Sequence, residues 1–79
     1  DMAQLTRSAK KEFDALPEKL RERARQTIKR LNDEPALGKK LQGKLSGKRS
    51  VRLGATHRII YTDDGSVVLR IRRRKDVYR

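Results

Sequence analysis

The chain has 79 residues, of which 22 are lysine or arginine and 10 are aspartate or glutamate, which gives a formal net charge of +12. It contains no cysteine, and this excludes disulfides, thiolate metal sites and a cysteine nucleophile. A chain this short has room for one small core, and no stretch approaches the ~20 apolar residues of a membrane span. We therefore expect a single domain in the cytoplasm with a polyanion as its partner.

The positive charge is concentrated in the second part of the chain. Residues 1–34 carry nine basic and seven acidic side chains, whereas residues 35–79 carry thirteen and three. One sign concentrated over half a small domain creates a field that attracts polyanions. Because Val, Leu and Ile alternate with these charges, we expect a folded sheet there and not a disordered tail or a membrane-surface helix.

The first 34 residues predict a short strand and two helices. Residues 2–5 are a weak strand candidate, and Thr6 can cap the helix that follows. Pro17 ends that helix or begins the next one. The apolar stripe of the first helix is Ala9, Phe13 and Leu16, and that of the second is Leu20, Ala24, Ile28 and Leu31. These spacings of three and four predict an antiparallel helical hairpin on one face of a sheet.

The second half predicts a loop followed by three strands. Residues 36–48 hold three glycines and four lysines and predict an ordered loop. Its expected anchors are Leu37, Leu41 and Leu45. From Ser50 the hydrophobic period changes to two. The predicted strands span residues 50–54, 57–62 and 66–72. Asp64 and Gly65 tolerate the positive φ of a hairpin turn, so we expect an antiparallel meander.

The alternation predicts that arginine side chains share the face of the sheet away from the helices. The apolar set expected to face the helices is Val51, Leu53, Val67, Leu69 and Ile71. The outward set is Arg52, Arg58, Arg70 and Arg72, closed off by Arg73, Arg74, Lys75 and Tyr78. Guanidinium groups bind phosphate through paired hydrogen bonds, and several together can stabilise charge on a scissile phosphate. This face is the candidate site.

Such a face is compatible with metal-free cleavage of RNA. The adjacent 2′-OH can act as the nucleophile if its geometry is in line and its proton is removed. The ring of Tyr78 could stack on a base while its hydroxyl takes part in proton transfer. On composition alone, electrostatic binding of RNA or DNA without catalysis is an equally good explanation. Further basic residues expected to bind RNA are Lys44, Lys48 and Arg49.

Three other positions have simpler interpretations. Tyr61 is in phase with the apolar residues, so we expect it in the core. His57 is the single histidine, and a lone histidine is more commonly structural or solvated than a general base. The pair Asp63–Asp64 belongs to the turn and not to a magnesium site, and no metal or other cofactor is expected.

Over nearly its whole length, the chain resembles the RelE/ParE superfamily of toxins from toxin–antitoxin modules. The segments that carry the resemblance are TRSAKKEFDALPEKLRERARQTIKRLNDEP, LGKKLQGKLSGKRSVRLGATHRIIY and VVLRIRRRKDVYR. It implies one toxin domain over residues 1–79, with an α+β, microbial-RNase-like fold of two N-terminal helices on a small antiparallel sheet. Members of the RelE branch enter the ribosomal A site and cut the bound message. The implied partners are the ribosome, messenger RNA and a cognate antitoxin.

The resemblance also implies roles for individual residues. Arg52 matches a basic residue that helps to hold the scissile phosphate, and Arg58 matches an arginine that stabilises the transition state. Arg74 is the best match to a later arginine of the phosphate site, and Tyr78 matches a tyrosine that orients or deprotonates the nucleophile. The chain departs from the pattern at Arg73, where many relatives have histidine, and it lacks a second lysine that ribosome-cutting members often carry near Ser50.

Two alternatives to the nuclease remain open at this stage. The ParE branch of the superfamily poisons DNA gyrase and does not need this catalytic set. A basic RNA-binding module without chemistry would also have such a composition. The arginines together with Tyr78 favour the RelE branch.

Overall fold

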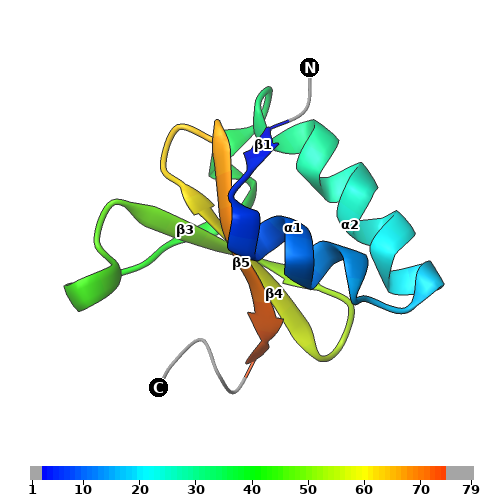
Figure 1. Cartoon of the computed structure of the whole chain (residues 1–79). Helices are drawn as coiled ribbons and strands as arrows, with labels where there is room; N and C mark the ends of the chain where they lie inside the picture. The colour runs from blue at the N-terminus through cyan, green and yellow to red at the C-terminus, as the bar shows by residue number, and fades with distance from the viewer. Residues whose placement is uncertain (1–2, 75–79) are drawn as a thin grey trace.

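The structure is a computed structural model that describes residues 3–74, and it consists of two helices packed on one side of a five-stranded sheet (Figure 1). The elements in chain order are β1 (Gln4–Leu5), α1 (Arg7–Asp14), α2 (Glu18–Leu31), the short 3-10 helix η1 (Pro35–Leu37), β2 (Lys39–Lys40), the 3-10 helix η2 (Gly43–Leu45), β3 (Lys48–Leu53), β4 (His57–Thr62) and β5 (Val67–Arg73). The strand order is β1-β5-β4-β3-β2. The predicted α+β architecture is confirmed.

The sheet is mixed, whereas an antiparallel sheet was expected. Strands β3, β4 and β5 form the predicted antiparallel meander. Strand β1 runs parallel to β5, with Gln4 opposite Val67 and Leu5 opposite Val68. Strand β2 pairs with β3 inside the segment expected to be a loop. Its two lysines are both exposed, so they leave no alternating pattern that would have revealed a strand.

Thr6 begins α1 as the sequence predicts. Its hydroxyl oxygen accepts a hydrogen bond of 3.1 Å from the backbone N–H of Ala9 and donates one of 2.9 Å to the carbonyl of Leu69. The same side chain therefore caps the helix and fixes its entry against β5. Pro17 precedes α2 at the N-cap position, where its missing N–H leaves no hydrogen bond unmade.

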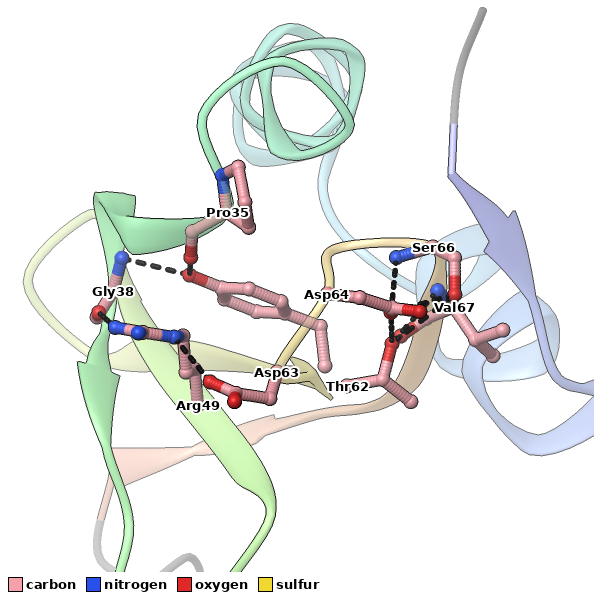
Figure 2. Close-up of polar contacts among 9 residues, drawn as sticks. Pro35, Gly38, Arg49, Thr62, Asp63, Asp64, Ser66 and Val67 are labelled. Atoms are coloured by element: carbon pink, nitrogen blue, oxygen red, sulfur yellow. Dashed lines mark hydrogen bonds and ion pairs between the residues drawn. The ribbon is translucent and has the colours of Figure 1, made fainter.

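The core lies between the two helices and the sheet face that they cover. Its buried apolar members are Ala3, Ala9, Phe13, Leu16, Ala24, Ile28, Leu31, Leu53, Ile59, Tyr61, Val68 and Ile71. Tyr61 is fully buried, as expected. Its hydroxyl donates to the carbonyl of Pro35 and accepts from the backbone N–H of Gly38, both at 2.7 Å, and Figure 2 shows these bonds as dashed lines at Pro35 and Gly38. This phenol ties the segment between α2 and β2 to the centre of the sheet.

The predicted inward positions of β5 are wrong for Val67 and Leu69. Val68 is the fully buried residue, and neither of its neighbours belongs to the core cluster. The cause is a β-bulge: Tyr61 lies opposite Val68 while Ile60 lies opposite Arg70, so Leu69 is an extra residue in β5. The bulge shifts the inward and outward alternation of β5 by one residue, so that Val68 and Ile71 both face the core.

The turn at Asp64 and Gly65 forms as predicted. A carboxylate oxygen of Asp64 accepts hydrogen bonds from the backbone N–H and the hydroxyl of Ser66 and from the hydroxyl of Thr62, at 2.7–3.0 Å (Figure 2). These bonds lower the pKa of Asp64 to about 2. Gly65 has φ +77°, a value that glycine adopts at no steric cost.

The long segment before β3 is anchored differently from the expectation. Leu37 packs against the core cluster as predicted, whereas Leu41 and Leu45 are half-buried and do not join it. The backbone supplies the other anchor, because the N–H of Leu41 donates to the carbonyl of Lys48 at 2.9 Å. Within residues 3–74, no helix is long and apolar enough to cross a membrane.

Candidate nucleic-acid interface

Three arginines lie side by side across the middle of the sheet. Arg52 of β3 is directly opposite Arg58 of β4, and Arg58 is directly opposite Arg72 of β5. Because neighbouring strands are ~4.8 Å apart, the three backbone positions span about 10 Å. We call these three residues the arginine row. Like charges placed directly opposite in a sheet are unfavourable, so packing alone does not explain this arrangement.

The arginine row faces away from the helices, as the alternation predicted. The next row along the same strands consists of Val51, Ile59 and Ile71, which lie in or against the core. Successive side chains of a strand point to opposite faces. Arg52 is exposed, and Arg58 and Arg72 are half-buried. A guanidinium that is partly removed from water attracts an anion more strongly than a fully solvated one.

Arg70 belongs to the same face by register but is neutralised by an acidic side chain. It lies opposite Ile60 of β4. Its guanidinium makes three hydrogen bonds of 2.9–3.3 Å to the carboxylate of Glu12 in α1. Burial raises the pKa of Glu12, but the bonds from Arg70 and from the backbone of Ile71, together with the positive charge of Arg72, outweigh it and lower that pKa below 4.5. The predicted RNA contact at Arg70 therefore competes with a salt bridge.

Arg49 makes structural contacts, and its RNA-binding role stays a prediction. It lies opposite Tyr61, and its side chain is only 17% exposed. Its guanidinium donates to Asp63 at 2.7 Å and to the carbonyl of Gly38 at 2.9 Å, as Figure 2 shows. These contacts tie β2 and the β4–β5 turn to β3.

The remaining predicted lysines lie toward the far end of the sheet. Lys48 is opposite Thr62, an even number of residues from Arg52, so it shares the face of the arginine row. Lys44 is an exposed residue of η2. Both stay predicted RNA contacts.

Arg73 and Arg74 lie beside His57 and not in the arginine row. Arg73 is directly opposite His57, and the backbone N–H of Arg74 donates to the carbonyl of Thr56 at 2.8 Å. These four residues line a hollow of about 410 Å³ at the end of the sheet. The hydroxyl of Thr56 lies 2.8 Å from Nδ1 of His57. Lys75 and Tyr78 lie outside the described residues.

The structure also brings basic residues near Arg52 that the sequence analysis did not single out. Arg23 and Arg30 of α2 line a hollow together with Arg52. The sequence did contain a signal, because Arg23 and Arg30 each precede a buried position of the helix. Among residues 3–74, no three His, Cys, Asp or Glu side chains gather closely enough to hold a metal ion.

A family model places the chain among known toxins. The model of the family described as ParE toxin of type II toxin-antitoxin system, parDE, matches residues 3–78. The chain belongs to this family. It is therefore a toxin of a type II toxin–antitoxin system, within the RelE/ParE superfamily.

A solved structure supports the same assignment for the fold of the toxin. The RelBE2 toxin–antitoxin complex of Mycobacterium tuberculosis contains a chain that is 26% identical to this one, with a TM-score of 0.74. The match covers 92% of this toxin and 96% of that chain. A search of curated proteins finds no match.

Proposed function

We propose that the toxin is a ribosome-dependent endoribonuclease that cleaves messenger RNA in the A site without a metal ion. The arginine row is the observation that carries this proposal. It gathers Arg52, Arg58 and Arg72 on the sheet face that the helices leave open. Three adjacent guanidinium groups suit a phosphodiester whose negative charge increases as the 2′-OH attacks.

We propose a place for each arginine around one phosphate, and the register supports it. Arg58 is the central residue, so it is suited to the non-bridging oxygens on which charge develops. Arg52 and Arg72 flank it and would hold the strand so that the 2′-OH is in line with the leaving 5′ oxygen. We propose Arg74 and Tyr78, by the resemblance, for proton transfer and for orienting the nucleophile. The ribosome would supply the remaining alignment of the message.

The gyrase inhibitor is the second candidate, and the name of the matching family favours it. That family is named for ParE toxins. A gyrase poison would use the basic face for docking and would leave messenger RNA intact. The arginine row favours the nuclease because docking alone does not require three like charges in direct register.

We propose a cognate antitoxin as the regulatory partner. The similar structure from M. tuberculosis is a toxin–antitoxin complex. An acidic antitoxin segment would be drawn to the face that carries the arginine row and would neutralise it. Purification of the toxin together with the adjacent gene product of its operon tests this, and separate elution of the two proteins would count against it.

A pair of parallel assays separates the two candidate activities. Purified toxin is incubated with programmed ribosomes, and cuts in the message are mapped by primer extension. Supercoiling by DNA gyrase is measured with the same preparation. We expect cuts at a fixed position relative to the A-site codon and normal supercoiling.

Substitutions in the arginine row connect the activity to its geometry. Arg58→Ala is expected to reduce cleavage by about 100-fold or more, the usual effect of removing one group that stabilises transition-state charge. Arg7→Ala is the control, because Arg7 is an exposed arginine of α1 that makes no ion pair among the described residues. Equal loss in both variants would indicate general electrostatic binding, and inhibited supercoiling with an intact message would establish the gyrase alternative.

A further inference from the structure

A hollow of about 280 Å³ lies between α2 and the end of β3. Its lining residues are Arg23, Gln26, Thr27, Arg30, Arg52, Leu53 and Gly54. We call it the α2 hollow. Among the described residues, no carboxylate lines it, and three of the seven lining residues are arginines. The proposed nuclease mechanism uses only Arg52 from this set.

The sequence of α2 determines which side chains face this hollow. The buried positions of the helix are Ala24, Ile28 and Leu31. Arg23, Thr27 and Arg30 each come one residue earlier, which places them about 100° around the helix from the buried stripe. Packing of the stripe on the sheet therefore turns this polar flank toward β3.

The turn after β3 closes one end of the α2 hollow. Gly54 has φ +62°, and a Cβ there would lie 3.0 Å from Cδ1 of Leu20. Any larger residue would be strained by the backbone angle and crowded by α2. The glycine therefore lets the turn approach α2 closely, and Gly54 forms part of the wall of the hollow.

The charge of the α2 hollow is only partly balanced. Arg30 forms an ion pair of 2.9 Å with Glu34. Arg23 and Arg52 form none with any residue in 3–74. Two guanidinium groups can therefore bind an added anion, and the amide of Gln26 and the hydroxyl of Thr27 are neutral donors on the same wall. This donor set suits a phosphate group.

Arg52 connects the α2 hollow to the arginine row. It lies opposite Arg58 in the row and also lines the hollow. Strand β2 pairs with β3 only at Arg49 and Ser50, so β2 does not cover the edge of β3 beside Arg52. One nucleic-acid strand can therefore pass from the sheet face over this edge into the hollow.

We propose that the α2 hollow binds a second phosphate of the RNA, next to the phosphate held by the arginine row. This inference rests on the proposed function in taking RNA as the ligand, and it adds α2 to the RNA-binding surface. An acidic peptide could satisfy the same guanidinium groups. The continuity with the row through Arg52 favours a strand with regularly spaced phosphates.

The test measures how the affinity for RNA depends on salt. The probe is a short fluorescein-labelled single-stranded RNA with 2′-O-methyl groups on every ribose, so that binding is measured without cleavage. Fluorescence anisotropy is recorded between about 0.05 and 0.5 M NaCl, and each phosphate neutralised contributes ~0.7 to the slope of log K against log salt. We expect Arg23→Gln to lower the slope by ~0.7 and Arg7→Gln to leave it nearly unchanged.

Two results of the salt titration and one result with an acidic peptide would contradict the inference. An unchanged slope in Arg23→Gln, or an equal change in Arg7→Gln, would show that α2 has no specific phosphate contact. A labelled oligoglutamate peptide is titrated in parallel with each protein. If Arg23→Gln binds the peptide more weakly than the wild type does but binds the RNA equally well, the hollow is a site for an acidic protein. Failure of the nuclease proposal is measured separately, by intact messages on programmed ribosomes, and it leaves the slope measurement valid. Circular dichroism spectra of both variants are recorded to check that each one is folded.

Discussion

Glu12 of α1 holds Arg70 of β5 at the edge of the sheet. Besides its three hydrogen bonds to the guanidinium, the Glu12 carboxylate accepts one of 2.9 Å from the backbone N–H of Ile71. Among residues 3–74, strand β1 pairs with β5 at Val67 and Val68, and no described strand pairs with the edge of β5 beyond them. The Glu12 carboxylate accepts the backbone hydrogen bond that a neighbouring strand would otherwise accept from Ile71. It thereby fixes the part of β5 that carries Arg72.

The first prediction concerns the pH dependence of this contact. We expect Glu12→Gln to lower the free energy of unfolding at pH 7 by about 1–2 kcal/mol, because hydrogen bonds to a charged group are replaced by neutral ones. The folded pKa of Glu12 lies below its ordinary 4.5, so its contribution is complete above that pH and is lost as the pH falls through the folded pKa. Urea unfolding of both proteins from pH 7 downward should show the gap closing in acid. A gap that does not change with pH would contradict the ion pair.

The second prediction concerns the buried phenol. Tyr61→Phe removes both hydrogen bonds of the hydroxyl and leaves the carbonyl of Pro35 and the N–H of Gly38 without that partner. We expect a loss of about 2 kcal/mol, since an unsatisfied buried group costs ~1–3 kcal/mol. Burial raises the pKa of Tyr61 above 10.0 despite the bond from Gly38, so this contribution is present below pH 10 and declines above it. Urea unfolding at pH 7 and above pH 10 measures both effects, and a loss below ~0.5 kcal/mol at pH 7 would rule out these bonds.

The third prediction compares two glycines that both have positive φ. In Gly65→Ala the new Cβ would collide with the carbonyl of Leu31, whereas Gly43 has no heavy atom within 4 Å of such a Cβ. We expect Gly43→Ala to cost only the ~1–2 kcal/mol of left-handed backbone and Gly65→Ala to cost clearly more. Thermal unfolding of the two variants checks the order. Equal losses would indicate that the β4–β5 turn does not press on α2.

The fourth prediction is that the arginine row lowers stability. Replacing Arg52 with threonine removes one of two like-charge pairs in direct register, so Arg52→Thr should raise the free energy of unfolding by ~0.2–1 kcal/mol. The gain should shrink in high salt, which screens charges at the surface. Chemical unfolding at low and high NaCl measures it. A variant less stable than the wild type at low salt would contradict the repulsion.

The alternation of side chains allowed much of the fold and part of the site to be predicted from the sequence. The helical stripes, the cap at Thr6 and the turn at Asp64 depend on local chemistry, and all were predicted correctly. The outward direction of Arg52 and Arg58 follows from uninterrupted strands. Strand β2 was not predicted, because two exposed lysines have no hydrophobic pattern.

The errors concern features that depend on contacts distant in sequence. The parallel pairing of β1 with β5 joins residues more than sixty positions apart, and no local signal specifies its direction. The salt bridge that occupies Arg70 depends on Glu12, which no periodicity connects to β5. The hollow beside Arg52 likewise appears only when α2 is packed on the sheet.

The bulge at Leu69 has a consequence for how sequence changes can be tolerated in this toxin. If β5 kept all its residues but had no bulge, strict alternation from Val68 would turn Arg70 and Arg72 inward and Ile71 to solvent. Deletion of Leu69 would instead give a regular ladder and leave Arg70, Ile71 and Arg72 on their present faces. A one-residue shortening at the bulge is therefore compatible with the arginine row, whereas loss of the bulge with every residue kept would remove Arg72 from it.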